Sequence, residues 1–255
     1  MQLSCDLKVG ANFKSPAQRA RVISEHWFEE NSYCLACDSD YLLRAAANTK
    51  AMDFSCKKCG QRYELKTFTR RPHTSLVDGA YASLMGRIES NSAPTLCLLE
   101  RNEAWKIYGL TAIHSSFLTR WVIEQRKPLS EKARRAGWIG CNIRLDRIPP
   151  DGEIAVIENG LCREKSDVRE QFKRFLPLAN LTPDQRGWTT LTLSIVRALK
   201  KSDFSLREVY EKEHEFAAAF PANHHIRAKI RQHLQVLRDL HIISFNGNGS
   251  YTVIS

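Results

Sequence analysis

The chain has 255 residues, enough for two modest domains that each bury a core. Lys and Arg number 38 against 28 Asp and Glu, and this surplus of +10 favours a polyanionic partner, nucleic acid first, although a merely basic protein also fits. The N-terminal residues lack the regions of a signal peptide and no apolar run is long enough to span a bilayer, so we expect a soluble, cytoplasmic protein with no membrane partner.

The first predicted element is a helix over residues 16–30, which Ser15-Pro16 opens and which places Ala20, Ile23 and Trp27 on one face. Two cysteine pairs follow it. They read Cys34-x2-Cys37, eighteen residues, Cys56-x2-Cys59, which is the paired spacing of a structural zinc site whose four thiolates close the tetrahedron. Four unligated cysteines are the alternative.

The remaining cysteines are scattered along the chain, and one of them lies in an apolar run. They are Cys5, Cys97, Cys141 and Cys162. Buried, reduced cysteines are typical of such positions, so we expect a reducing compartment and no disulfides.

Charged residues flank the second cysteine pair. Strands are predicted over residues 51–55 and 61–67, and pairing outward from the intervening turn places Asp53 opposite about Arg62, with Glu64 and Lys66 further along on the same face. Two carboxylates and the backbone carbonyl of Leu65 suit a catalytic magnesium ion, and Lys66 would orient the attacking water or stabilise developing charge. Solvated charges on an ordinary hairpin produce the same pattern.

The middle of the chain predicts a sheet with flanking helices. A basic loop at 69–73 precedes an amphipathic helix over 75–89, and residues 95–99 form a near-continuous apolar strand that belongs at the centre of a sheet. Residues 104–110 alternate as a neighbouring strand and 154–157 form a last one. These elements indicate an α/β core of roughly 160 residues. Residues 163–187, with ten charged side chains and two prolines, are predicted as a connector.

A basic, glycine-punctuated segment at 125–140 carries Arg134, Arg135 and Trp138. The indole in such a loop can pack on a base or a methyl group of nucleic acid. A tryptophan buried in the core is the alternative.

From Trp188 onward the sequence predicts three helices and a hairpin. The helices are expected from Trp188, from a capping box at Ser205–Glu208 to about Ala219, and over 223–237, and Asn246-Gly247-Asn248-Gly249 marks the turn. This is the order of a winged helix-turn-helix. With Ile226, Ile230, Leu234 and Leu237 buried, the third helix would present Ala228, Arg231, Gln232 and Gln235 to a DNA major groove, with Arg227 and Lys229 at the edges. His224 and His225 would meet a phosphate or base, or lie in solvent, and a protein-binding winged helix is the other interpretation of the module.

The sequence resembles the DpnI-like methyladenine-dependent (type IIM) restriction endonuclease family over nearly its full length. The resemblance lies in Tyr33-Cys34 with the paired cysteines, Asp53-Phe54, Glu64-Leu65-Lys66, Asp78 to Ala82, Gln125 to Leu129, Ala133 to Ile143, Arg186-Gly187-Trp188-Thr189, His225-Ile226 and Lys229-Ile230-Arg231-Gln232. The chain departs from the family at residues 38–52 and 67–75, at Ala228, and at Met52, where the nuclease motif has its proline.

The resemblance implies an α/β PD-(D/E)XK nuclease domain with an inserted four-cysteine zinc element over 1–180 and an α+β winged helix-turn-helix domain over 181–255. It implies Mg²⁺-dependent cleavage of double-stranded DNA at G(m6A)TC, with the methyl group read by both domains. By position, Asp53, Glu64 and Lys66 match the catalytic residues, Cys34, Cys37, Cys56 and Cys59 the zinc ligands, and Trp138 an aromatic near the methyl-reading surface.

The sequence therefore predicts a monomeric type II restriction endonuclease with catalytic Mg²⁺ and structural Zn²⁺, whose partner is adenine-methylated duplex DNA. Its predicted DNA-binding residues are Arg134, Arg135, Trp138, His225, Arg227, Lys229, Arg231 and Gln232. A zinc-stabilised winged-helix regulator that does not cleave DNA is the main rival. An RNA-directed protein is disfavoured, because a helix presented to the major groove suits B-form DNA.

Overall fold

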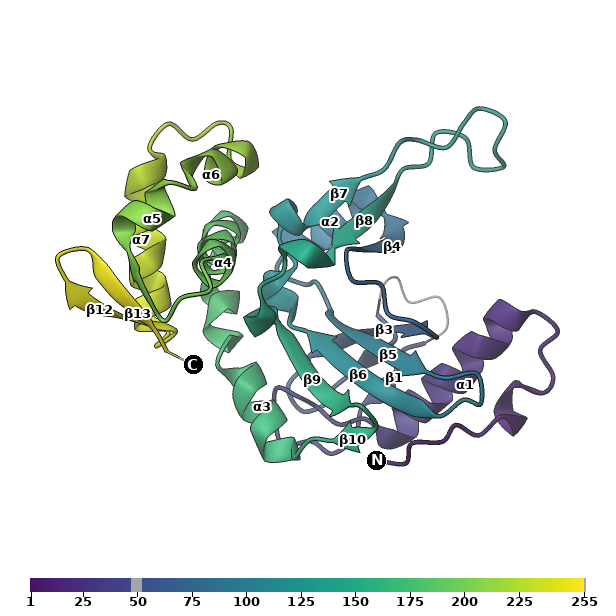
Figure 1. Cartoon of the computed structure of the whole chain (residues 1–255). Helices are drawn as coiled ribbons and strands as arrows, with labels where there is room; N and C mark the ends of the chain where they lie inside the picture. The colour runs from purple at the N-terminus through teal and green to yellow at the C-terminus, as the bar shows by residue number, and fades with distance from the viewer. Residues whose placement is uncertain (47–51, 255) are drawn as a thin grey trace. The chain divides into compact units, whose positions relative to one another are not determined.

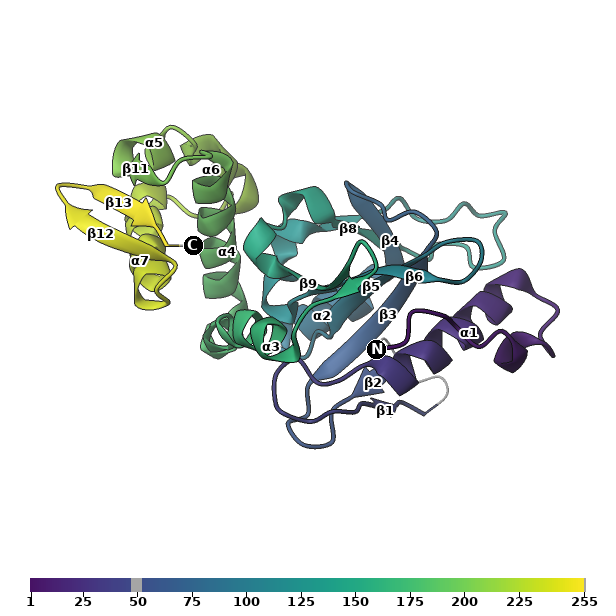
Figure 2. The same ribbon diagram turned by 60° about the horizontal axis from the view of Figure 1, so that its bottom comes forward.

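The computed structural model describes residues 1–46 and 52–254. The chain divides into two compact units, each made of several stretches of sequence (Figures 1 and 2). The first unit comprises Met1–His73, Ser92–Ser115 and Glu153–Leu176, and the second comprises Thr74–Asn91, Ser116–Gly152 and Pro177–Ser255.

The first unit is a seven-stranded mixed sheet in the order β1-β2-β3-β5-β6-β9-β10, in which β3 and β5 run parallel and the other neighbours run antiparallel. Its strands are β1 (Leu43–Arg44), β2 (Phe54–Ser55), β3 (Arg62–Phe68), β5 (Thr95–Arg101), β6 (Ile107–Ile113), β9 (Glu153–Glu158) and β10 (Leu161–Cys162). The predicted apolar strand is therefore central, with three strands on either side, and the sheet is the mixed α/β core that the sequence predicts.

Two helices cover one face of this sheet: α1 (Pro16–Asn31) and α3 (Lys165–Lys173). Trp27 and Phe28 of α1 and Val168 and Phe172 of α3 share one buried cluster with the alternate residues of the strands that point to this face. Because side chains alternate along a strand, Glu64 and Lys66 of β3 lie on the opposite face from Tyr63 and Leu65.

Three expectations for the first unit are wrong in detail. Residues 163–187 are not an unstructured connector: Val168 and Phe172 bury at i,i+4 spacing and build α3, although charged residues surround them. The strand expected over 104–110 begins at Ile107, because Trp105 adopts a left-handed φ of 59° in the preceding turn. A short strand, β10, follows the one expected to be last, and Ala51 of the first predicted hairpin strand lies outside the described residues.

The second unit contains a three-stranded antiparallel sheet in the order β4 (Ser75–Ala80), β8 (Gly140–Arg144), β7 (Ile123–Gln125). Helix α2 (Tyr81–Glu89) directly follows β4 in the sequence. The helix predicted over 75–89 is thus half wrong. Leu76 is buried while Val77 is 62 % exposed, which is the alternation of a strand, and only Leu84 and Ile88 follow helical spacing.

The C-terminal part of the second unit is a winged helix-turn-helix. It contains α4 (Pro183–Ala198), β11 (Asp203–Ser205), α5 (Leu206–Tyr210), α6 (Glu213–Ala219), α7 (Ile226–Asp239) and the hairpin β12 (Ile243–Gly247) with β13 (Ser250–Val253). The sheet order is β11-β13-β12, so the hairpin gains a third strand.

The helix boundaries of this module differ from the prediction at three places, and one of them is the helix expected over 223–237, which spans Ile226–Asp239. α4 begins five residues before Trp188, where Thr182 and Gln185 form a capping box, and the helix expected from Ser205 to Ala219 divides into α5 and α6. The capping box of Ser205 and Glu208 is confirmed. Short 3-10 helices occupy Lys8–Gly10, Ser115–Phe117, Arg120–Val122, Leu145–Arg147, Pro150–Gly152 and Leu176–Asn180. No helix within residues 1–46 and 52–254 has the length and apolarity that crossing a membrane requires.

Candidate functional site

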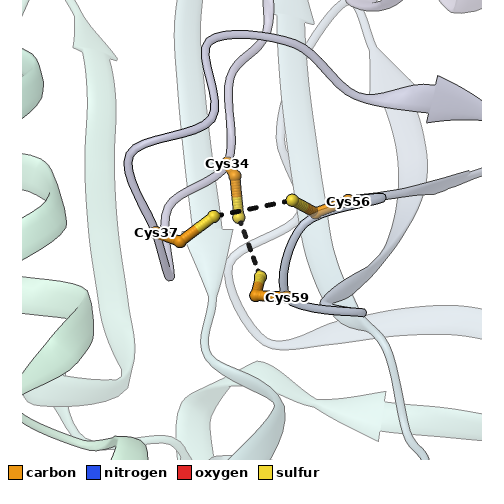
Figure 3. A group of neighbouring side chains, drawn as sticks. All are labelled: Cys34, Cys37, Cys56 and Cys59. Atoms are coloured by element: carbon orange, nitrogen blue, oxygen red, sulfur yellow. Dashed lines mark hydrogen bonds between the residues drawn. The ribbon is translucent and has the colours of Figure 1, made fainter.

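The four paired cysteines converge on one point of the first unit (Figure 3). Their Sγ atoms all lie within 4.8 Å of one another, with 3.5 Å between Cys34 and Cys59 and 3.6 Å between Cys37 and Cys56. Sulfurs held about 2.3 Å from a tetrahedral zinc ion lie about 3.8 Å apart, so the four thiols fit that ion closely. Four protein ligands leave no open position, and a zinc ion here would serve folding only.

The backbone around the cysteines is fixed by the hairpin that follows. Gly60 adopts φ +76°, its N–H donates to the carbonyl of Cys56, and the N–H of Cys56 donates to the carbonyl of Gln61. The buried Tyr63 hydroxyl accepts from the N–H of Leu35 at 2.9 Å and lies 3.3 Å from Sγ of Cys34. The cysteine cluster is therefore tied directly to strand β3.

Asp53 immediately precedes β2 and lies beside Leu65 of β3. Its N–H donates to the carbonyl of Tyr63 at 2.9 Å, and its Oδ2 accepts from the N–H of Leu65 at 2.8 Å. The predicted register is wrong by two residues, because Ser55, not Asp53, pairs with Arg62, and Phe54 pairs with Tyr63. A slip of two residues leaves the side chains of β3 on the faces that the prediction gave them, whereas Asp53 itself lies outside β2 and meets β3 through these two hydrogen bonds.

Glu64 and Lys66 follow each other at i,i+2 on that face. Nζ of Lys66 lies 2.6 Å from Oε1 of Glu64, and their side chains are 24 % exposed for the lysine and 9 % for the glutamate. The N–H and C=O of one strand residue point to the same side, so the carbonyl of Leu65 points toward the edge where its N–H meets Asp53. The Asp53 carboxylate thus bonds the backbone of β3 between Glu64 and Lys66, and the charge of Lys66 acts on it.

Burial raises the pKa of the Asp53 carboxyl above its ordinary value, and the hydrogen bond from Leu65 and the charge of Lys66 oppose that rise. Two charged residues of α1, Glu25 and Arg21, also act on Asp53, the first raising and the second lowering its pKa. They form an ion pair of 2.5 Å with each other. The sequence places both off the buried face of the helix, and only the packing of α1 brings them toward Asp53.

Arg71, from the predicted basic loop, lies on the same face of the sheet as Lys66. Its guanidinium pairs with Glu153 at 2.7 Å and bonds the Thr111 hydroxyl at 3.2 Å. Thr111 pairs with Leu98, which pairs with Lys66, so the three side chains form one row across the sheet. The sequence analysis did not identify Arg71 as a site residue. Its position in the basic loop at 69–73 was the available signal.

In the second unit, the predicted basic segment is the loop between β7 and β8, which extends beyond the ends of both strands (Figure 1). Arg134 and Arg135 are exposed, and Trp138 is half-buried at the base of the loop, with the guanidinium carbon of Arg135 4.9 Å from its ring centroid. Trp138 is thus neither a core residue nor fully free in solvent.

Helix α7 buries Ile230, Leu234 and Leu237, as predicted, whereas Ile226 is only half-buried. Most of the predicted groove-facing and edge side chains are exposed, with Lys229 partly so: Arg227, Ala228, Lys229, Arg231, Gln232 and Gln235. Arg227 pairs with Glu213 at 2.8 Å, and Arg231 donates to the Tyr210 hydroxyl at 2.8 Å. His225 is exposed at the N-terminus of the helix, where its N–H donates to Asn223. The wing, residues 242–254, carries no charged residue, so of these two surfaces only α7 offers cations.

His233 is a buried residue of α7 that the sequence reasoning missed. Its ring stacks on Trp188 of α4 at 5.9 Å, and its Nδ1 lies 2.9 Å from the Thr189 hydroxyl. Phe220 stacks on Trp188 at 4.1 Å and Phe216 at 5.6 Å. The position of His233 between Ile230 and Leu237, at i+3 and i−4, was the available signal that it faces the core.

Two family profiles match the chain and together cover nearly all of it. The profile of DpnI, described as the Dam-replacing family, matches residues 1–181, and the profile of its C-terminal part, described as the Dam-replacing HTH domain, matches residues 184–253. The first match includes the cysteine cluster and the group around Asp53, and the second includes the whole winged helix. The chain belongs to the Dam-replacing family, that of DpnI, and is therefore a DNA-binding restriction endonuclease.

Proposed function

We propose that this chain is a Mg²⁺-dependent type IIM restriction endonuclease that hydrolyses phosphodiester bonds of double-stranded DNA at G(m6A)TC. In this proposal the first unit's sheet is a PD-(D/E)XK nuclease core, and both the nuclease domain and the winged helix read the methyl group. The observation that supports the proposal is the hydrogen bond from the Leu65 N–H to Asp53, between the two members of the Glu64–Lys66 ion pair on β3.

The donors at this position suit a small, hard cation. Magnesium prefers oxygen ligands, and Asp53, Glu64 and the carbonyl of Leu65 would hold it. When bound, magnesium would polarise the scissile phosphate and offset the charge that develops on it. The Leu65 N–H fixes Oδ2 of Asp53 at 2.8 Å, which orients that carboxylate before any ligand arrives.

Lys66 is the residue that would act on the nucleophile. Its ammonium group lies 2.6 Å from Glu64, so it can donate to an attacking water on the same face and offset negative charge on the phosphate. The water oxygen bonds to phosphorus, one ester P–O bond breaks, and the released oxygen ends protonated. No covalent bond to the protein forms.

Target recognition is assigned to two surfaces: helix α7 of the winged helix, and the β7–β8 loop, which lies within residues 1–180 of the proposed nuclease domain. Helix α7 would enter the major groove, with Arg231 and Gln232 at base edges and Lys229 at a phosphate. The β7–β8 loop would bind DNA with Arg134 and Arg135, and Trp138 would contact the methyl group. Burying one methyl group contributes about 0.8 kcal/mol, which is roughly fourfold, so two methyl groups on a palindrome would give about fifteenfold discrimination. We therefore expect slower cleavage of hemimethylated sites, and equal rates on both duplexes would contradict this account.

The test is the incubation of adenine-methylated and unmethylated plasmid with the protein, with and without Mg²⁺. The proposal expects fragments only from methylated plasmid and only with Mg²⁺, and a methylated plasmid whose GATC sites are altered should stay intact. Methylated plasmid that is bound but uncut at high protein concentration would instead favour a non-cleaving winged-helix regulator. Effective competition by duplex RNA would contradict DNA as the partner.

A further inference from the structure

Trp138 lies directly against Gly140 in the second unit. A methyl group on the Gly140 Cα would stand 2.8 Å from both Cζ3 and Cη2 of the indole, and 3.6 Å from Cδ of Arg126. Contacts of carbon with carbon below 3.0 Å are strongly repulsive, so the six-membered ring of Trp138 occupies space that only a glycine leaves open.

The backbone of Trp138 is held from both sides. Its carbonyl accepts from the N–H of Leu129 at 2.9 Å, and its own N–H donates to the carbonyl of Arg135 at 3.1 Å. The N–H of Gly137, at φ +75°, also donates to the carbonyl of Leu129. The guanidinium of Arg135 lies 4.9 Å from the ring centroid. The loop therefore fixes the position of the Trp138 backbone, and the contact with Gly140 fixes the position of the six-membered ring of the indole.

The backbone of Gly140 cannot move away to relieve a collision. Gly140 is the first residue of β8, the middle strand of its sheet: it pairs with Ala80 of β4, and its carbonyl accepts from the N–H of Arg126 at 3.0 Å. The neighbouring carbonyl of Ile139 accepts from Tyr81. Gly140 also lacks a left-handed φ, so the strand conformation itself tolerates alanine. An added methyl group would displace the indole and leave the strand in place.

We propose that Gly140 is a positioning residue for Trp138: its missing side chain sets the indole in the orientation that reads the methyl group of the target adenine. This inference rests on the proposed function, because it assigns to Gly140 the placement of a side chain that the proposed function places against that methyl group. Gly140 itself does not contact DNA in this proposal.

The test is a double-mutant cycle of Gly140→Ala and Trp138→Ala, read as the ratio of affinities for methylated and unmethylated GATC duplexes without Mg²⁺. We expect each single variant to lower that ratio by a similar factor. We expect Gly140→Ala to change nothing further once Trp138 is alanine, because no ring is left to displace. Gly86→Ala, at an exposed helix position where a methyl group meets nothing within 4 Å, is the matched control.

Each other outcome has a distinct meaning. If Trp138→Ala lowers the ratio and Gly140→Ala does not, the inference fails while the proposed function stands. If Gly140→Ala lowers the ratio equally in the Trp138→Ala background, Gly140 acts on the strand and not through the indole, which also overturns it. An unchanged ratio in Trp138→Ala removes the proposed role of Trp138 itself. If Gly140→Ala does not fold, a cooperative thermal unfolding transition restored by the added Trp138→Ala supports the inference. A double variant that also fails to fold contradicts it.

Discussion

The N–H of Leu65 donates a 2.8 Å hydrogen bond to Oδ2 of Asp53, and this bond joins an acid that precedes β2 to a central part of β3. Glu64 and Lys66 are the residues on either side of Leu65, so one peptide unit fixes the position of Asp53 relative to both. The same hydrogen bond opposes the rise in the Asp53 pKa that burial causes, and it favours the charged form that a cation requires.

Replacing Asp53 with asparagine tests that arrangement. Asp53→Asn keeps the shape of the side chain and can still accept from Leu65, but it removes the charge that would hold Mg²⁺. The loss of several kcal/mol of transition-state stabilisation lowers the cleavage rate by roughly a thousandfold or more. Single-turnover cleavage of methylated duplex is the measurement, with DNA binding unchanged. Asp6→Asn, at an exposed carboxylate that bonds the Lys8 N–H, is the control, and a fully active Asp53→Asn enzyme would exclude the assigned site.

The cysteine cluster predicts a metal requirement for folding. Cys56→Ser removes one of four thiolates around the point where the sulfurs meet, so we expect loss of bound zinc and of soluble, cooperatively unfolding protein. Zinc content per chain and thermal unfolding are the measurements. Cys162→Ser, which changes an exposed cysteine outside the cluster, should behave as the unmodified protein does. A well-folded Cys56→Ser protein that contains no zinc would refute the structural zinc site.

His233 predicts acid sensitivity of the winged helix. Burial, with the charge of Lys229 adding to it, lowers the pKa of His233 to about 4 from 6.5. The unfolded chain therefore binds the proton first, so the stability that neutral His233 contributes is intact above about pH 6.5 and is lost as pH falls toward about 4, by on the order of 3 kcal/mol.

Denaturant unfolding of the full chain at about pH 7 and about pH 4.5, on either side of the ordinary histidine pKa, measures this effect. His233→Gln should lower stability at neutral pH but remove part of the decline between the two pH values, whereas His73→Gln, at an exposed histidine, should leave the decline unchanged. An equal decline in the His233→Gln protein would show that other groups cause it.

Helix α7 predicts two kinds of binding defect. Lys229→Ala should weaken binding to all DNA sequences alike and reduce the slope of log K against log salt by about one, because one phosphate contact is lost. Arg231→Ala should cost about 1–3 kcal/mol and relax preference at one base pair. Titrations at several salt concentrations with GATC and altered duplexes separate the two. Arg207→Ala, an exposed cation on α5, is the control, and identical effects of both α7 variants would contradict their assigned positions.

The sequence by itself determined the features that depend on residues close together in the chain. Paired cysteines, the apolar strand at 95–99, the capping box at Ser205 and the periodicity of α7 each depend on residues a few positions apart. Each is found, with Ile226 of α7 half-buried rather than buried. The family resemblance is likewise a property of the sequence alone, and the two profile matches confirm it.

Only the tertiary structure decided the relationships between distant residues. The register of Asp53 depends on how the turn after β2 closes, which spacing does not fix, and a slip of two residues satisfied the same pattern. Helix α3 was not predicted because most of its residues are charged or polar. Burial of Val168 and Phe172 stabilises the helix only when the sheet is present for it to cover. The approach of Glu25 to Asp53 and of Trp138 to Gly140 follows from packing, which no local periodicity encodes.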